Sequence, residues 1–139
     1  MKTVVIYKWS RSTASALVRA DGQVDWGSAK MAAGDDDPAA LAIAKALAGA
    51  GGTVTGLTIG DGETAWALAR GVETTHVAPA VGPLADNAAT AQALAEAVRA
   101  IGAADAVVIA DPVGHPGVAP ALAAELGWPA LLGVTSAEP

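Results

Sequence analysis

The sequence contains no cysteine and no phenylalanine, one tyrosine, and only eight lysine and arginine residues among 139. Without cysteine, neither a disulfide framework nor a thiolate metal site is available. Because the net charge is −6, we expect no nucleic-acid surface, which would need a clustered basic patch. No apolar run reaches membrane length and no signal-peptide pattern is seen, so we expect a cytoplasmic protein without membrane insertion.

Hydrophobic residues make up 53% of the chain, which is enough for a core. The length suits one compact domain over residues 1–139. Short apolar runs alternate with helical patterns, and this alternation is typical of a parallel sheet covered on both sides. We therefore predict an α/β fold, a Rossmann-like three-layer sandwich with a five-stranded parallel sheet. The strands are predicted at residues 3–7, 53–59, 74–78, 106–110 and 130–134.

Capping and breaking residues indicate where the helices begin and end. An Asp cap followed by Pro38 opens the first helix, and glycines 49–52 close it. A second helix is predicted at 63–70. Asn87 is predicted to cap a helix over 88–101, and Gly127 to stop a helix over 118–126. The fourth strand, 106–110, is apolar throughout and is predicted to be buried on both faces.

A turn signal at residues 20–23 lies between two short apolar runs. It predicts a small hairpin insertion over Ala16–Trp26, after the first strand. The segment between the first strand and this hairpin, Lys8 to Ser15, is rich in hydroxyl groups and is predicted to be a loop.

The candidate ligand site combines the loops that follow the first and fourth strands. We predict that these strands are adjacent, so that their carboxyl ends form a ligand crevice. An arginine fork with hydroxyl groups suits a phosphate, and backbone N–H groups of a glycine loop collect anions. A solvated loop remains the alternative for the first segment, and a turn glycine with a helix stop for the second. The candidate cofactor-binding residues are Lys8, Trp9, Ser10, Arg11, Ser12, Asp111, Gly114, His115 and Gly117.

The sequence contains no nucleophile elbow and no evident catalytic acid–base pair. Its two histidines, His76 and His115, do not have metal-ligand spacing. The acidic run 35–37 is interpreted as a helix cap that complements the helix dipole. We therefore expect a binding protein rather than an enzyme, with no catalytic residues and no metal.

Four stretches resemble one known family, the electron transfer flavoprotein β subunit, in its N-terminal nucleotide-binding domain. They are the opening strand and lysine (Met1–Lys8), the hairpin position (Ala16–Trp26), the second strand with its closing glycine (Gly51–Gly60), and the helix with a Gly-Trp-Pro turn (Val118–Pro129). The resemblance covers essentially the whole chain but only about half of a full family member.

The resemblance implies a subunit that pairs with an α-like subunit and supports electron transfer. It implies an adenine nucleotide, either AMP or the adenylate of FAD, shared with that partner. Because the flavin of that family lies mainly on the α partner, we expect the isolated chain not to hold FAD firmly. Trp9 and Trp26 are the candidate interface residues, with a homodimer as the second possibility.

Two other functions remain open from the residues. Gly114, Gly117 and Gly127 resemble the spacing of ATP-binding universal stress proteins, although Trp128 stands where that motif has Ser or Thr. That reading predicts a stand-alone AMP- or ATP-binding protein. The third possibility is a hydrolase or transferase acting on a nucleotide α-phosphate, as in relatives of this fold.

Overall fold

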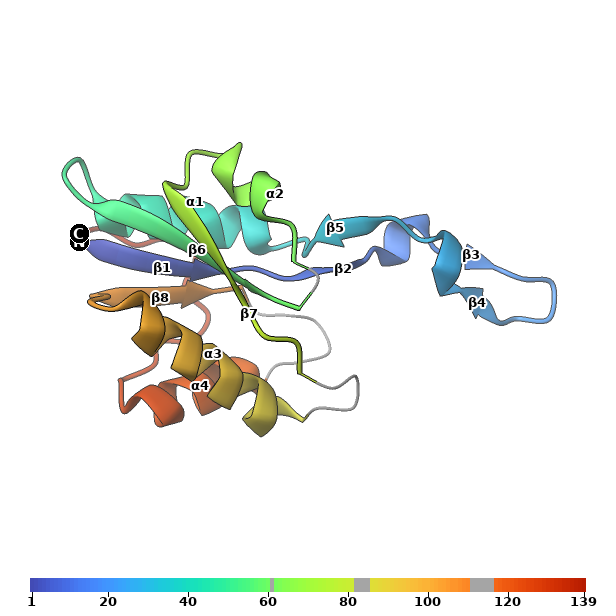
Figure 1. Cartoon of the computed structure of the whole chain (residues 1–139). Coiled ribbons are helices and arrows are strands. Elements are labelled where there is room, and N and C mark those ends of the chain that lie inside the picture. The colour runs from blue at the N-terminus through green and yellow to red at the C-terminus, as the bar shows by residue number, and fades with distance from the viewer. Residues whose placement is uncertain (61, 82–85, 111–116) are drawn as a thin grey trace.

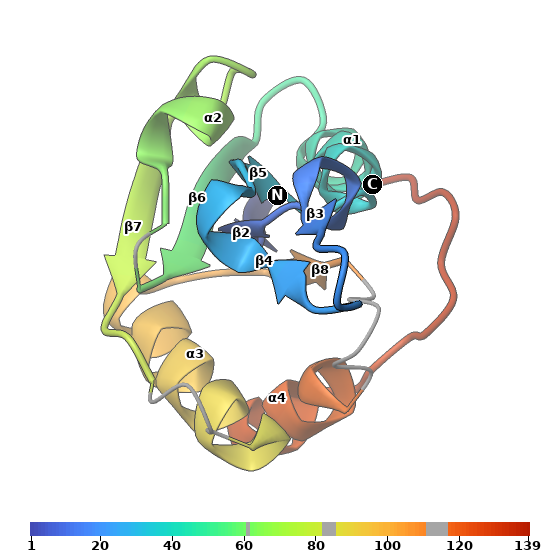
Figure 2. The ribbon, with the colours of Figure 1, turned by 90° about the vertical axis from the view of Figure 1, so that its right-hand side faces the viewer.

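The computed structural model describes residues 1–60, 62–81, 86–110 and 117–139. A parallel sheet of four strands lies between two layers of helices (Figure 1 and Figure 2). The strands run in the order β7-β6-β1-β8. Their bounds are β1 (Lys2–Ile6), β6 (Thr53–Ile59), β7 (Thr74–Ala78) and β8 (Ala106–Ile109). The predicted α/β fold with a parallel sheet is confirmed, and so is the adjacency of the first and fourth predicted strands.

Alternation along β1 builds two cores, one on each face of the sheet. Val4 and Ile6 pack with α3 (Asn87–Ile101) and α4 (Val118–Leu126). Val5 and Tyr7, the residue directly after β1, pack with α1 (Asp37–Ala48) on the opposite face, where α2 (Thr64–Leu68) also lies. All four side chains are buried, and full burial of one aliphatic side chain contributes about 1.5–3 kcal/mol.

The predicted fifth strand is wrong, because residues 130–134 form no strand. Pro129 has no backbone N–H to donate, Gly133 has a positive φ of 68°, and Leu131 is 86% exposed. Within the described ranges β8 consequently pairs with β1 alone and forms an edge of the sheet. Its four residues are half-buried, with Val107 and Ile109 packed against one core and Val108 against the other, so the prediction of burial on both faces is confirmed only in part.

Two helix starts differ in detail from the predictions. Asp86, and not Asn87, caps α3, since its side chain accepts a hydrogen bond from the backbone N–H of Ala89 at 2.8 Å. Asp36 is the N-cap residue of α1, but its side chain makes no capping hydrogen bond. No helix in the described ranges is long and apolar enough to cross a membrane.

The connection between β1 and α1 projects from the sheet as an extended arm, residues 8–34 (Figure 1). The predicted hairpin is confirmed as β3 (Leu17–Val18) paired with β4 (Val24–Asp25). A second ribbon, β2 (Trp9–Arg11) with β5 (Met31–Ala33), joins this hairpin to the body. Residues 8–15 are therefore not simply a loop, because three of them form β2. Short 3₁₀ turns, Thr13–Ser15 and Trp26–Ser28, separate the two ribbons.

Candidate functional site

The strand order places a topological switch point at the carboxyl ends of β1 and β8. From β1 the chain adds β6 and then β7 on one side, and it returns to the other side for β8. In open α/β sheets, ligands bind in the crevice outside the carboxyl ends of the strands at such a reversal. The described segments that reach this crevice are the start of the arm and the start of α4.

A buried carboxylate holds the base of the arm against α1. Asp37 is 2% exposed, and its Oδ2 accepts hydrogen bonds from the backbone N–H of Lys8 at 3.0 Å and of Gly34 at 2.6 Å. Burial raises the pKa of Asp37 from 3.8 to about 6, because desolvation outweighs the stabilisation from these two donors. The carboxylate thus joins both ends of the arm at the carboxyl end of β1.

An aromatic stack borders the same edge of the sheet. Tyr7 donates a hydrogen bond from its hydroxyl to the backbone oxygen of Glu63 at 2.6 Å. The centre of its ring lies 4.9 Å from the centre of the Trp66 ring. The guanidinium of Arg70 lies 4.6 Å from the centre of the Trp66 ring. Burial, followed by the nearby charges of Glu63 and Asp37, raises the pKa of Tyr7 to about 12. The phenol is therefore neutral near pH 7 and acts as a fixed hydrogen-bond donor.

The predicted site residues of the first loop lie along the arm. The side chain of Lys8 is exposed and that of Trp9 is half-buried, next to the end of β1. Ser10 and Arg11 pair with β5, and Ser12 donates its backbone N–H to the oxygen of Lys30 at 2.7 Å.

Arg11 is engaged within the arm itself. Its Nη1 donates to the backbone oxygens of Gly27 at 3.3 Å and Ala29 at 3.0 Å. One of its terminal nitrogens thus holds the 3₁₀ turn Trp26–Ser28 next to β2. Lys8 and Trp9 are consequently the members of this group that lie nearest the crevice.

Gly117 is the described part of the second predicted loop, whereas Asp111, Gly114 and His115 lie outside the described residues. Gly117 caps α4 without a side-chain hydrogen bond. A Cβ at Gly117 would collide with the amide of Asn87, so the backbone here passes close to the start of α3. Pro120 in the first turn of α4 has no N–H, so Val118 and Ala119 are the residues whose N–H groups have no side-chain acceptor from their own N-cap residue, an arrangement that suits an anion.

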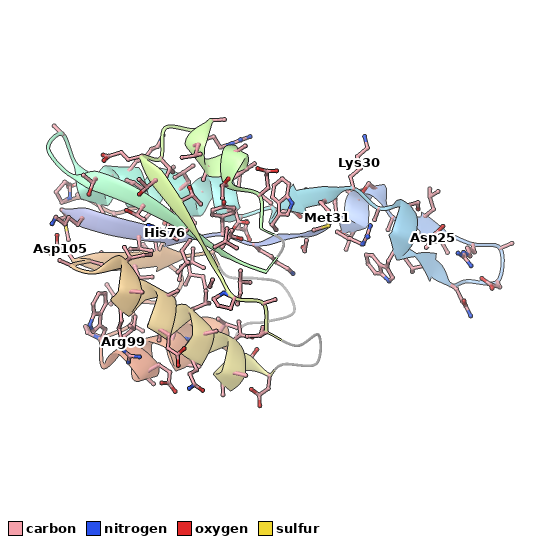
Figure 3. All side chains as sticks on the ribbon, viewed as in Figure 1. Asp25, Lys30, Met31, His76, Arg99 and Asp105 are labelled. Atoms are coloured by element: carbon pink, nitrogen blue, oxygen red, sulfur yellow. The ribbon has the colours of Figure 1, made fainter. Side chains whose placement is uncertain are left out.

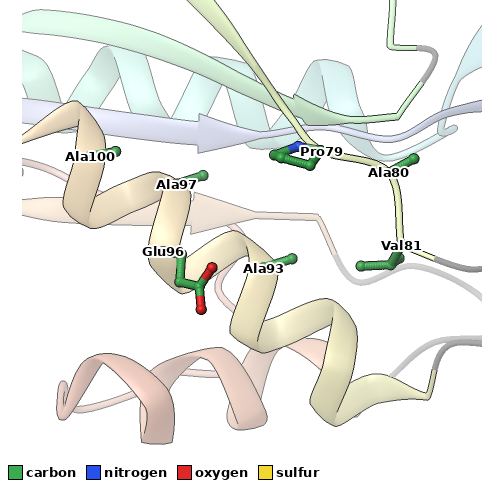
Figure 4. A pocket seen from close by; sticks show the side chains of 7 residues that line it. All are labelled: Pro79, Ala80, Val81, Ala93, Glu96, Ala97 and Ala100. Carbon is green, nitrogen blue, oxygen red and sulfur yellow. The ribbon is translucent and has the colours of Figure 1, made fainter.

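An open surface pocket of about 310 Å³ lies beside α3, next to the segment that follows β7 (Figure 4). Small apolar side chains form most of its wall, and one carboxylate, that of Glu96, lies at its side. The lining residues come from the segment after β7 and from one face of α3. They are Pro79, Ala80, Val81, Ala93, Glu96, Ala97 and Ala100.

Sequence reasoning missed Asp37 and the Tyr7–Trp66 stack as parts of this edge. Asp37 was grouped with Asp35 and Asp36 as a helix cap, and the three carry the same side chain. Its position in the sequence could have distinguished Asp37 from the other two, because the residue directly before Pro38 lies within the first helical turn. Tyr7 was placed correctly at the end of the first strand, but its partner lies 59 residues away in α2.

Comparison with known proteins gives one family. The family model of the electron transfer flavoprotein domain matches residues 28–138. This match includes β5 of the arm, the sheet strands after β1, and all four helices. No curated protein matches the chain.

Proposed function

Because the chain belongs to the electron transfer flavoprotein domain family, we propose that it is a β-like subunit of such a flavoprotein. It binds an adenine nucleotide, AMP or the adenylate of FAD, at the carboxyl ends of β1 and β8. It supports electron transfer together with an α-like partner subunit. The observation that carries the proposal is the switch point between β1 and β8 in a chain of this family.

The residues at the crevice suit the nucleotide. In the first turn of α4 the backbone N–H groups of Val118 and Ala119 receive no hydrogen bond acceptor from the side chain of their N-cap residue, Gly117, and suit a phosphate. Lys8 is exposed at the facing strand end and supplies a cation. Trp9 offers a half-buried ring beside it. FAD, when bound, supplies the redox chemistry, and the residues of this chain hold and orient its adenylate.

Thermal unfolding of the purified chain with AMP, FAD, ATP and GMP tests the nucleotide site. A ligand that binds only the native state, at a hundred times its dissociation constant, adds about 2.7 kcal/mol to stability. We expect AMP to raise the melting temperature and GMP to have little effect. Lys8→Ala should reduce the effect of AMP. The matched control is Lys2→Ala, which removes an exposed lysine at the opposite end of β1 and should leave the AMP effect unchanged.

Three results would contradict the proposal. If neither AMP nor FAD stabilises the chain, the nucleotide site is wrong. If ATP stabilises far more than AMP, the chain is instead a stand-alone ATP-binding protein. If the isolated chain purifies as a yellow, flavin-loaded monomer, the division of the cofactor with an α-like partner is wrong.

A further inference from the structure

The arm has almost no core of its own. Of residues 9–33, Ala29 alone is buried in the described structure. Two-stranded ribbons by themselves are marginally stable in water. An exposed apolar surface on such a ribbon is typical of a protein–protein contact. The large apolar side chains exposed along the arm are those of Leu17, Val18, Val24, Trp26 and Met31.

These apolar side chains lie on both faces of the arm. In the hairpin Val18 pairs with Val24, so the two share one face, and Leu17 belongs to the opposite face because neighbouring strand residues alternate. In the ribbon of β2 with β5, the register places Met31 on the same face as Trp9. A flat surface would cover one of these faces only. A partner that covers the exposed apolar side chains therefore encloses the arm in a groove.

The arm is basic, whereas the rest of the chain is acidic. Residues 8–34 carry four of the eight basic side chains and two of the fourteen acidic ones, which gives the arm a net charge of +2 and leaves −8 for the remaining residues. Lys30 is exposed and projects from the arm (Figure 3). The exposed Arg19 has its Nη2 3.7 Å from Oδ2 of Asp25. The surface that complements the arm is consequently an apolar groove with an acidic rim.

The arm starts at the nucleotide crevice. Asp37 holds both of its ends there, because it accepts hydrogen bonds from the backbone N–H groups of Lys8 at 3.0 Å and of Gly34 at 2.6 Å. Trp9 follows directly and is half-buried. A protein that covers the arm from its base therefore also reaches the crevice, as a subunit that shares an FAD bound there must do.

The open pocket beside α3 does not have the character that the arm requires. Glu96 lines this pocket and Arg99 lies on the same helix, so one charge of each sign is present. We propose, on the basis of the β-like function given above, that the arm is the part of this chain that binds the α-like subunit. That subunit encloses the arm in an apolar groove with an acidic rim, in which Trp26 is buried.

Photo-crosslinking in a purified complex tests which surface meets the partner. The probe is the electron transfer flavoprotein α subunit of the same organism, co-expressed with the full chain, and size-exclusion chromatography first shows whether the two form a complex. A photoreactive benzoylphenylalanine replaces Trp26 in one variant and, as the matched control, the exposed Trp128 in another. We expect illumination to join the α subunit to the variant altered at position 26 and not to the control.

Substitutions in the arm measure its share of the affinity. Trp26→Ser removes its largest exposed apolar side chain, and Lys30→Glu reverses one of its charges. Trp128→Ser and Lys2→Glu make the same changes at exposed positions outside the arm. We expect Trp26→Ser to raise the dissociation constant of the complex about tenfold or more, and Lys30→Glu to slow association. Both controls should bind like the wild type, with circular dichroism confirming that all variants are folded.

Complex formation and the arm contact can fail separately. If the two subunits form no complex, neither the arm contact nor the β-like function holds. If they form a complex but position 26 gives no adduct with the α subunit, or both arm variants bind like the wild type, the arm is not the contact and the β-like function stands. An adduct at position 26 that joins two copies of this chain would overturn the choice of partner.

Discussion

Asp37 is a buried carboxylate whose described donors are backbone N–H groups rather than cations. The pKa of Asp37 is about 6 in the folded protein and 3.8 for an ordinary exposed aspartate, as in the unfolded chain. The native state therefore binds a proton more tightly than the unfolded chain. Stability from this group is complete below pH 3.8 and is lost as pH rises through about 6. The difference in pKa corresponds to about 3 kcal/mol.

We therefore expect Asp37→Asn to flatten the pH dependence of the free energy of unfolding. As the pH rises from about 4 to about 7, the free energy of unfolding of the wild type should fall by up to about 3 kcal/mol relative to that of the variant. Denaturant titrations at several pH values measure this difference, and any fixed cost of the amide cancels. Asp35→Asn, an exposed member of the same run, should follow the wild-type profile. Parallel profiles for wild type and Asp37→Asn would show that the buried carboxylate does not titrate in this range.

For single residues, the sequence predicted the position of a residue in a strand or loop better than its burial or its hydrogen-bond partners. Tyr7 at the end of the first strand and Lys8 after it follow directly from the apolar run. The burial of Asp37 could not be predicted, because it depends on Lys8 and Gly34 coming together from the two ends of the arm. Arg11 likewise finds its acceptors in residues 16 and 18 positions away.

In the turn between α1 and β6, the backbone passes close to the end of α1 and to the N-terminus of the chain. A Cβ at Gly52 would collide with the backbone oxygens of Ala48 and Met1. Around Gly51 there is open space, and its φ is not positive. The two adjacent glycines therefore have different roles, although the sequence presents them alike.

We expect Gly52→Ala to destabilise the protein by about 2 kcal/mol or more, because the backbone of α1 or β1 must move. Gly51→Ala should change the free energy of unfolding by less than about 1 kcal/mol, and in the stabilising direction, because alanine restricts the unfolded chain. Denaturant unfolding of both variants measures the contrast. Equal losses for the two would mean that the chain does not approach Gly52 closely.

Among elements, the parallel strands and the four helices were predictable because local periodicity and glycine stops mark them. The error over residues 130–134 has a non-local cause: an apolar run forms a strand only where a partner edge is aligned with it. The ribbon of β2 with β5 was missed for the same reason, since its short segments lack alternation and pair across the whole hairpin.

On the scale of the whole molecule, the arm is separate from the two cores. Neither core cluster includes a described residue between 9 and 33. The ends of the arm lie side by side, because both Lys8 and Gly34 donate to one oxygen of Asp37. A short turn can therefore join them without disturbing β1 or α1.

We expect a variant in which a short glycine-containing turn replaces residues 9–33 to fold cooperatively. Its free energy of unfolding should lie within about 1 kcal/mol of the wild type, since the closure entropy of a surface loop changes slowly with length. Its binding to the α-like subunit should be lost. Denaturant unfolding and size-exclusion chromatography with that subunit measure the two quantities. A variant that fails to fold would show that the arm contributes to the cores.

The separation of a basic arm from an acidic body makes the molecule an electric dipole. In dilute salt a second charged surface would turn the molecule before contact, so that the arm leads the approach to an acidic partner. Such preorientation raises the rate of encounter and leaves the dissociation rate to the apolar contact that follows. Added salt should therefore slow the association step while the lifetime of the formed complex changes little.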